Sequence, residues 1–189
     1  MEHIENLRAS SWTNVLGRRL QYLGGSPVDA LSQGIELEPL PLWIQVVCDE
    51  LVERGVFPKD KPPNHCLLND YRPGQGIEAH KDGPLYLPRV AVLSLGSHAT
   101  LQFSADEAEQ GLLASLLLPP RGLLVFAGEA YRQHLHSVVA AVSDDLELPG
   151  LVRLGDAHSA PVTTPHAERF LPRARRLSLT LRRVRRWWE

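Results

Sequence analysis

The chain has 189 residues and a formal net charge of −2, which suits one domain with one substantial core over residues 1–189. That charge argues against a protein coated all over by nucleic acid or bound to a membrane surface. Two cysteines permit at most one disulfide bond, and no stretch reaches the ~20 apolar residues of a membrane span. We therefore expect a monomer without membrane attachment, in a reducing compartment that is cytoplasmic and/or nuclear.

The first third of the chain predicts a strand, a helix and a stiff connector. The segment up to about residue 29 ends in Gly-Gly-Ser-Pro and is typical of a strand and turn rather than a core helix. Apolar residues recur at helical spacing over residues 41–54, which predicts a helix that packs against a sheet. Residues 57–63 are rich in proline and indicate a rigid connection.

Short apolar or alternating runs separated by turn residues follow, and they predict a mainly β fold with a flanking helix. Residues 143–172 carry acids, prolines and small residues without periodicity, and we expect a flexible insertion there. The predicted strands cover residues 89–95, 99–103, 115–118, 123–126 and 176–182.

A His-x-Asp pair, His80 and Asp82, follows a polar, turn-rich lead-in at residues 69–74. If the pair is extended, its side chains project from one face with Cα atoms roughly 7 Å apart, so both reach one metal ion. An imidazole and a carboxylate, completed by a distant second histidine, form the 2-His-1-carboxylate triad that leaves positions open on Fe(II). The pair therefore predicts an iron site if a second histidine is available.

The second histidine has two candidates, His134 and His136. Two positions apart on a strand, they would share one face, so periodicity leaves the choice between them open. A single histidine at such a position is more often a surface side chain or a hydrogen-bonded core side chain. The combination with His80 and Asp82 is what indicates a metal site.

Residues 176–182 alternate strictly between polar side chains and leucines. One face of this strand is apolar, and the other carries two arginines and two hydroxyl side chains. By itself the pattern is typical of a half-solvated edge strand. In the alternative, Arg176 and Arg182, about 20 Å apart along the strand, lean inward and bracket a short dicarboxylate such as 2-oxoglutarate.

Four elements in the same order resemble the AlkB family of Fe(II)/2-oxoglutarate-dependent dioxygenases over residues 64–184. Residues 12–27, 82–86 and 94–98 are similar to one member of that family in particular. The arginine-bearing last strand argues against a cupin-like metal protein with unrelated chemistry. The four elements are Asn69-x-Tyr71-x-Pro73-Gly74, His80-x-Asp82, a Gly-Glu-Ala element before His136, and Arg176-x-Ser178-x-Thr180-x-Arg182.

The resemblance implies a double-stranded β-helix, or jelly roll, that holds Fe(II). Its iron ligands and catalytic residues would be His80, Asp82 and His136. It decides between the two histidines, because His136 occupies the position of the family's distal ligand and His134 does not.

The resemblance also implies a 2-oxoglutarate site. Asn69 and Tyr71 match family residues that hydrogen-bond the cosubstrate. Arg176 matches the residue at its distal carboxylate, and Arg182 the one near its metal-bound end. Ser178 stands where many members have Asn, and we place it at the same site as a departure from the pattern.

Residues 12–27 match part of the family's lid over the substrate, which makes Arg18, Arg19 and Gln21 candidates for substrate contacts. The alternative is that these three are ordinary surface residues. The family normally has a further strand and helix before this segment, so the chain is expected to be shortened at its N-terminus.

The predicted function is that of a dioxygenase that uses Fe(II), 2-oxoglutarate and O₂ to remove an alkyl group oxidatively from nucleic acid. Single-stranded DNA or RNA is a candidate partner, although the arginines in residues 169–186 are more typical of cosubstrate binding, within the strand, and of solvated positions elsewhere. Trp187 and Trp188 are candidates for stacking on bases. Two alternatives are oxidative demethylation of a protein and a non-catalytic binding module on a degenerate barrel.

Overall fold

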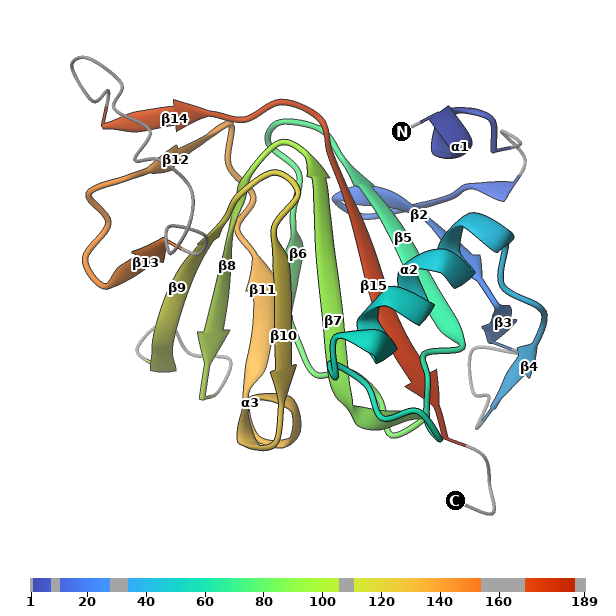
Figure 1. The fold of residues 1–189 in the computed structure, drawn as a ribbon. Helices are drawn as coiled ribbons and strands as arrows, with labels where there is room; N and C mark the ends of the chain where they lie inside the picture. The colour runs from blue at the N-terminus through green and yellow to red at the C-terminus, as the bar shows by residue number, and fades with distance from the viewer. Residues whose placement is uncertain (1, 8–10, 28–33, 106–110, 154–168, 186–189) are drawn as a thin grey trace.

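Two β-sheets face each other in the computed structural model, which describes residues 2–7, 11–27, 34–105, 111–153 and 169–185 (Figure 1). The larger sheet has the strand order β1-β2-β5-β15-β7-β10, and the smaller has the order β13-β9-β8-β11-β6. Two further pairs, β3-β4 and β12-β14, lie beside them. The arrangement confirms the predicted mainly β class and the jelly roll.

The element bounds agree with the strands and the helix expected from hydrophobic periodicity. In the larger sheet they are β1 Thr13–Val15, β2 Arg18–Leu23, β5 His65–Tyr71, β7 Tyr86–Gly96, β10 Leu123–Ala127 and β15 Arg176–Val184. In the smaller sheet they are β6 Ile77–His80, β8 Ala99–Ser104, β9 Leu112–Leu118, β11 Leu135–Val138 and β13 Leu151–Arg153. The remaining elements are α1 Glu2–Glu5, β3 Gly25–Pro27, β4 Ile35–Leu37, α2 Leu42–Glu53, α3 Glu129–Arg132, β12 Ser143–Asp145 and β14 Phe170–Pro172.

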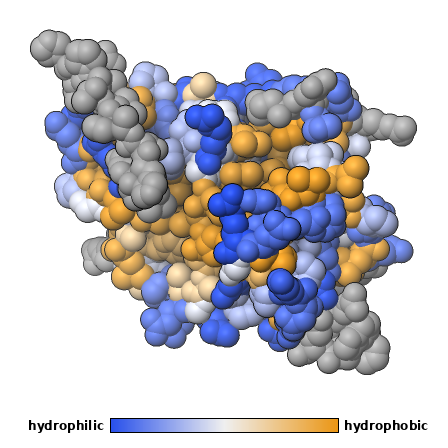
Figure 2. Space-filling model, viewed as in Figure 1, coloured by the Kyte–Doolittle hydropathy of each residue, from blue (hydrophilic) through white to orange (hydrophobic). Residues whose placement is uncertain are grey.

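Helix α2 covers the outer face of the larger sheet (Figure 1). Its inward side chains, Ile44, Cys48 and Leu51, recur at helical spacing and are buried. Each such side chain contributes about 1.5–3 kcal/mol by leaving water. On the opposite face Leu42 and Val46 are exposed. Figure 2 shows hydrophobic surface on this side of the molecule. Among the described residues, no helix has the length and apolar character needed to cross a membrane.

Strand β15 lies in the centre of the larger sheet, so the reading of residues 176–182 as a half-solvated edge strand is wrong. It pairs antiparallel with β5 on one side and with β7 on the other. Leu177, Leu179 and Leu181 belong to the core cluster that includes α2. The alternation between leucine and polar residues is real, but the polar face points into the barrel instead of into water.

Residues 143–172 were expected to form a flexible insertion, and their described parts are paired strands. β12 pairs with β14, and β13 adds in parallel to the edge of the smaller sheet at β9. Residues 154–168, within the same range, lie outside the described residues, as do Trp187 and Trp188.

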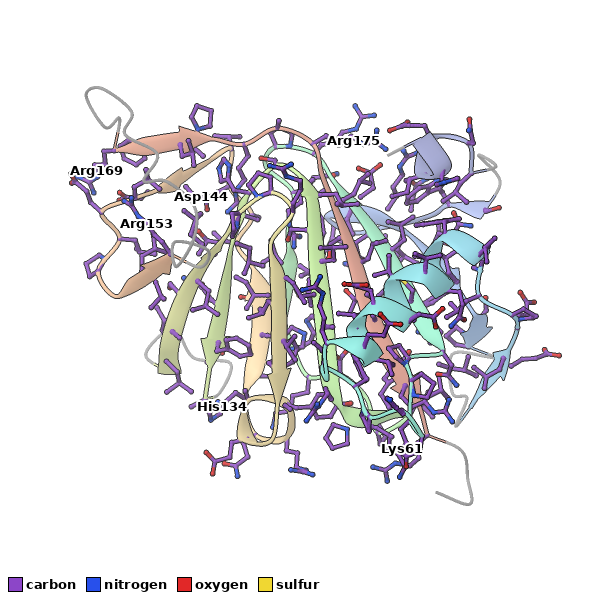
Figure 3. All side chains as sticks on the ribbon, in the orientation of Figure 1. Lys61, His134, Asp144, Arg153, Arg169 and Arg175 are labelled. Carbon is purple, nitrogen blue, oxygen red and sulfur yellow. The ribbon has the colours of Figure 1, made fainter. Side chains whose placement is uncertain are left out.

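Asp144 on β12 anchors this region through a buried ion pair. Its carboxylate accepts hydrogen bonds from Arg173 Nε at 2.7 Å and from Thr100 Oγ1 at 2.5 Å, and it contacts His98 Nε2 at 3.2 Å. Burial opposes ionisation of the Asp144 carboxyl, but hydrogen bonds from Arg173, His98 and Thr100 outweigh it and hold its pKa well below the usual range. Figure 3 shows Asp144 next to the strands that it joins.

We expect Asp144→Asn to destabilise the fold by about 3–5 kcal/mol, because it leaves the buried Arg173 guanidinium without a counter-charge. Since the pKa is lower in the folded state, the stabilisation from Asp144 is present above about pH 4 and is lost as the pH falls through the folded-state pKa. Urea unfolding should therefore show a gap between wild type and variant that shrinks below pH 4. Asp145→Asn, which breaks an exposed pair with Arg169, is the matched control and should change little. An equal effect of both substitutions would contradict the prediction.

Candidate functional site

Two neighbouring strands of the smaller sheet bring His80 and His136 together. The two residues are direct Cα partners in the antiparallel pairing of β6 with β11, and their ring centroids lie 4.3 Å apart. The strands approach closely at Gly76, where a β-carbon would lie 2.3 Å from the carbonyl oxygen of Val138. A side chain at this position would push the two strands, and hence the two imidazoles, apart.

Asp82 completes the group, although not from within the strand. β6 ends at His80, so Asp82 lies two residues beyond the strand. One ligand atom from each of His80, Asp82 and His136 nevertheless lies within 4.8 Å of the others. The segment that follows β6 therefore places the Asp82 carboxylate beside the two imidazoles.

The surroundings of the three donors suit a metal cation. The His80 Nδ1 faces the carbonyl oxygen of Glu78 at 2.8 Å, so Nδ1 carries the proton and Nε2 is left as the ligand atom. Burial and the neighbouring His80 lower the pKa of His136 to about 4. Asp82 Oδ1 accepts a hydrogen bond from Arg182, whereas the buried Oδ2 has no partner among the described residues. The unpartnered carboxylate oxygen is a position that a metal ion would satisfy.

His134 lies outside the group. His134 precedes β11, which begins at Leu135. The two histidines therefore do not share one strand face, as they would if both belonged to β11. Figure 3 places it at the end of the smaller sheet beside α3. The three-residue group found in the described part of the chain contains His136 and not His134.

Arg176 stands at the opposite end of β15 from Arg182, with only 2% of its surface exposed. Its Nη2 donates to Ser94 Oγ at 2.9 Å, but the buried Nε and Nη1 have no partner among the described residues. Burial lowers the pKa of this guanidinium below its usual value. A buried cation with two unused donors is costly unless an anion binds it, so a carboxylate fits this position.

One cavity between the sheets joins the two ends of the site. All the residues expected at the iron and at the cosubstrate contribute to its wall. Thr180 lines it too, as its place on the polar face of β15 implies. The contact of Ser94 with Arg176 was not predicted, because it depends on which strands pair with β15. The lining residues are Leu67, Asn69, Tyr71, Ile77, His80, Asp82, Val90, Val92, Leu101, Phe126, His136, Val138, Arg176, Ser178, Thr180 and Arg182.

The three residues expected to contact substrate lie on β2, outside the lining of this cavity. Arg18 Nε donates to Asn69 Oδ1 at 2.8 Å, which places it directly behind a cavity residue. Arg19 pairs with the buried Asp70 at 2.8 Å and is thereby committed to a structural partner. The Gln21 Oε1 is buried and without a hydrogen-bond partner among the described residues.

Two imidazoles and one carboxylate at the edge of a cavity in a jelly roll define the class of mononuclear non-haem iron oxygenases. Comparisons with known proteins agree. The sequence pattern of the 2OG-Fe(II) oxygenase superfamily matches residues 8–182. The probable RNA/DNA demethylase ALKBH6 of Danio rerio is 34% identical over 183 residues, which cover 92% of this chain and 74% of that protein.

Two more distant proteins are also similar to this chain, one in sequence and one in fold. The tRNA (carboxymethyluridine(34)-5-O)-methyltransferase ALKBH8 of Macaca fascicularis is 30% identical over 78% of this chain, but the match spans 22% of that protein. Among solved structures, OsALKBH1 shares the fold with a TM-score of 0.59 and 16% identity, covering 96% of this chain and 88% of that chain. The chain belongs to the 2OG-Fe(II) oxygenase superfamily, and within it to the AlkB family. ALKBH6 is the member that residues 12–27, 82–86 and 94–98 resemble.

Members of this family use Fe(II) as cofactor, 2-oxoglutarate as cosubstrate and O₂ as second cosubstrate. The unpartnered Asp82 oxygen and the unused donors of Arg176 fit these two groups. The protein is therefore an Fe(II)/2-oxoglutarate-dependent dioxygenase.

Proposed function

We propose that this dioxygenase removes an alkyl group oxidatively from a nucleic-acid base. The observation that carries the proposal is the pairing of a three-donor group with a buried, unsatisfied Arg176 at the other end of the same cavity. The demethylase name of the zebrafish relative supports a nucleic-acid substrate. Oxidative demethylation of a protein is the alternative that the test below separates.

In the proposed site His80, Asp82 and His136 hold Fe(II), which supplies the activation of O₂ when 2-oxoglutarate is bound. Arg176 binds the distal carboxylate of 2-oxoglutarate through Nε and Nη1, and Ser94 holds the guanidinium in place. These assignments divide the cavity into a metal end and an anchoring end.

Other side chains orient and shield these groups. Arg182 fixes the Asp82 carboxylate, and Tyr86 lies under the Arg182 guanidinium at 4.0 Å from the ring centroid. The apolar walls formed by Val92, Leu101 and Phe126 exclude water, which strengthens the charge interactions inside. Asn69, Tyr71 and Ser178 offer polar atoms to the cosubstrate between the two ends.

The test is the release of succinate and formaldehyde from 2-oxoglutarate and an N-methylated single-stranded oligonucleotide, with Fe(II) in air. The unmethylated oligonucleotide is the control and should give succinate without formaldehyde. Formaldehyde from a methylated peptide but from no methylated DNA or RNA would support protein demethylation. Binding of 2-oxoglutarate with no succinate at all would support a non-catalytic module.

A further inference from the structure

Three hollows adjoin one another from the metal end of the site outward. Asp82 lines both the interior cavity and a surface hollow of about 310 Å³ that also includes Gly83 and Tyr131. Pro88 and Arg132 line both that hollow and a groove of about 700 Å³ between the end of α2 and the residues after β10. The surface hollow and the groove therefore lie side by side, between the candidate iron ligand Asp82 and the connector at residues 57–63. We call the surface hollow and the groove together the basic groove.

Positive charge is concentrated along the basic groove in a chain whose formal net charge is −2. The described acidic residues in its lining are Glu53 and Asp82, and Asp82 is neutralised by Arg182. A groove in which positive charges outnumber negative ones attracts a polyanion more strongly than an isolated surface charge does. The basic residues in its lining are Lys59, Lys61, Lys81, Arg89, Arg132, Arg183 and Arg185.

The backbone under these cations is held in place by hydrogen bonds. Tyr131 donates from its hydroxyl to the carbonyl oxygen of Gly83 at 3.1 Å, which ties α3 to the turn after Asp82. Arg89 donates to the carbonyl oxygen of Val56 at 2.5 Å and fixes the start of the connector. These two contacts hold the turn after Asp82 and the start of the connector in place, which reduces the ordering of the protein that binding an extended ligand would require.

We propose that the basic groove binds the phosphodiester backbone of a single-stranded nucleic acid whose modified base enters at Asp82. This inference rests on the proposed nucleic-acid substrate and names the surface that holds it. A base has to leave a duplex before it reaches a buried site, so a single strand fits better than a double helix. Five accessible cations contact phosphates in this arrangement, namely Lys59, Lys61, Lys81, Arg132 and Arg185.

The test measures the fluorescence anisotropy of a labelled oligothymidylate with the full chain at several salt concentrations. Five phosphate contacts predict a slope of log K against log salt near about −3.5, since each contributes about 0.7 for single strands. Arg132→Glu and the double variant Lys59→Glu/Lys61→Glu should each weaken binding at low salt by at least about threefold and flatten the slope.

Arg153→Glu is the matched control, because it makes the same charge change on an exposed arginine of β13, far from Lys61 (Figure 3). It should bind oligothymidylate as wild type does. Melting temperatures check that each variant is folded, and the double variant alone decides the outcome if Arg132→Glu does not fold.

Wild-type affinity and slope in the groove variants would overturn the inference while leaving dealkylation untouched, since succinate release by wild type is a separate measurement. Equal weakening by Arg153→Glu would mean a diffuse charge effect and would also overturn it. Tighter binding of an acidic peptide than of oligothymidylate would assign the groove to a protein partner instead. Absence of succinate from wild type, by contrast, would count against the proposed function whatever the groove binds.

Discussion

His80→Ala is expected to abolish 2-oxoglutarate turnover, with a loss of more than about 100-fold in succinate release. The variant removes one of three donors that lie within 4.8 Å of each other, and losing only an outer-shell partner of a metal ligand already costs about 10–100-fold. Binding of Mn(II) or Co(II), followed by isothermal titration, should weaken in parallel. This second measurement reports on the metal site independently of activity.

His134→Ala is the control for this prediction. His134 belongs to the same stretch of chain as His136 but lies outside the three-donor group, so its loss should leave metal affinity and turnover near wild type. Succinate release that survives in His80→Ala, or that disappears in His134→Ala, would remove His80, Asp82 and His136 from the proposed role.

Arg176→Met is expected to weaken 2-oxoglutarate binding by about 30-fold or more, because truncating a buried, charge-assisted pair typically costs 2–5 kcal/mol. The same substitution should not lower the melting temperature of the ligand-free protein. Burying a guanidinium whose Nε and Nη1 have no partner among the described residues lowers the stability of the ligand-free protein, since Arg176 is only 2% exposed. An apolar side chain of similar length removes this energetic cost. Thermal shift with and without 2-oxoglutarate measures both effects in one experiment.

The contrast with Arg175→Met sharpens this test. Arg175, labelled in Figure 3, is the preceding residue, but it pairs with the buried Asp70 at 2.9 Å and with the exposed Glu5 at 2.7 Å. Its replacement should lower the melting temperature and leave 2-oxoglutarate affinity intact. If Arg176→Met instead destabilised the ligand-free protein and kept its affinity for 2-oxoglutarate, Arg176 would be a structural residue only.

Periodicity was sufficient to predict the local elements. The helical spacing that buries Ile44, Cys48 and Leu51 predicted α2, and the alternation over residues 176–182 correctly separated an apolar from a polar face. The composition of the His-x-Asp pair predicted a metal site, which the grouping of His80, Asp82 and His136 matches. For α2, for β15 and for the His-x-Asp pair the information lies within a few residues of the chain, whereas His136 was chosen over His134 only through the family resemblance.

Long-range pairing was beyond the reach of the sequence pattern. Alternation says which side chains share a face but not whether that face meets water, so β15 resembled an edge strand until β5 and β7 were seen on either side. For the same reason the contact of Ser94 with Arg176 could not be foreseen. The sequence pattern also placed His134 and His136 on one strand, whereas the observed strand β11 begins at Leu135 and excludes His134.

The central place of β15 has a consequence for how the protein is made. β5 and β7 are joined only through β15, so the larger sheet cannot be complete before residues 176–184 have been synthesised. The histidines and the aspartate are synthesised earlier, whereas Arg176 and Arg182 arrive with the bridging strand. Arg176 and Arg182 therefore face the two histidines and the aspartate only once β15 lies between β5 and β7, so completing the larger sheet also completes the dicarboxylate site.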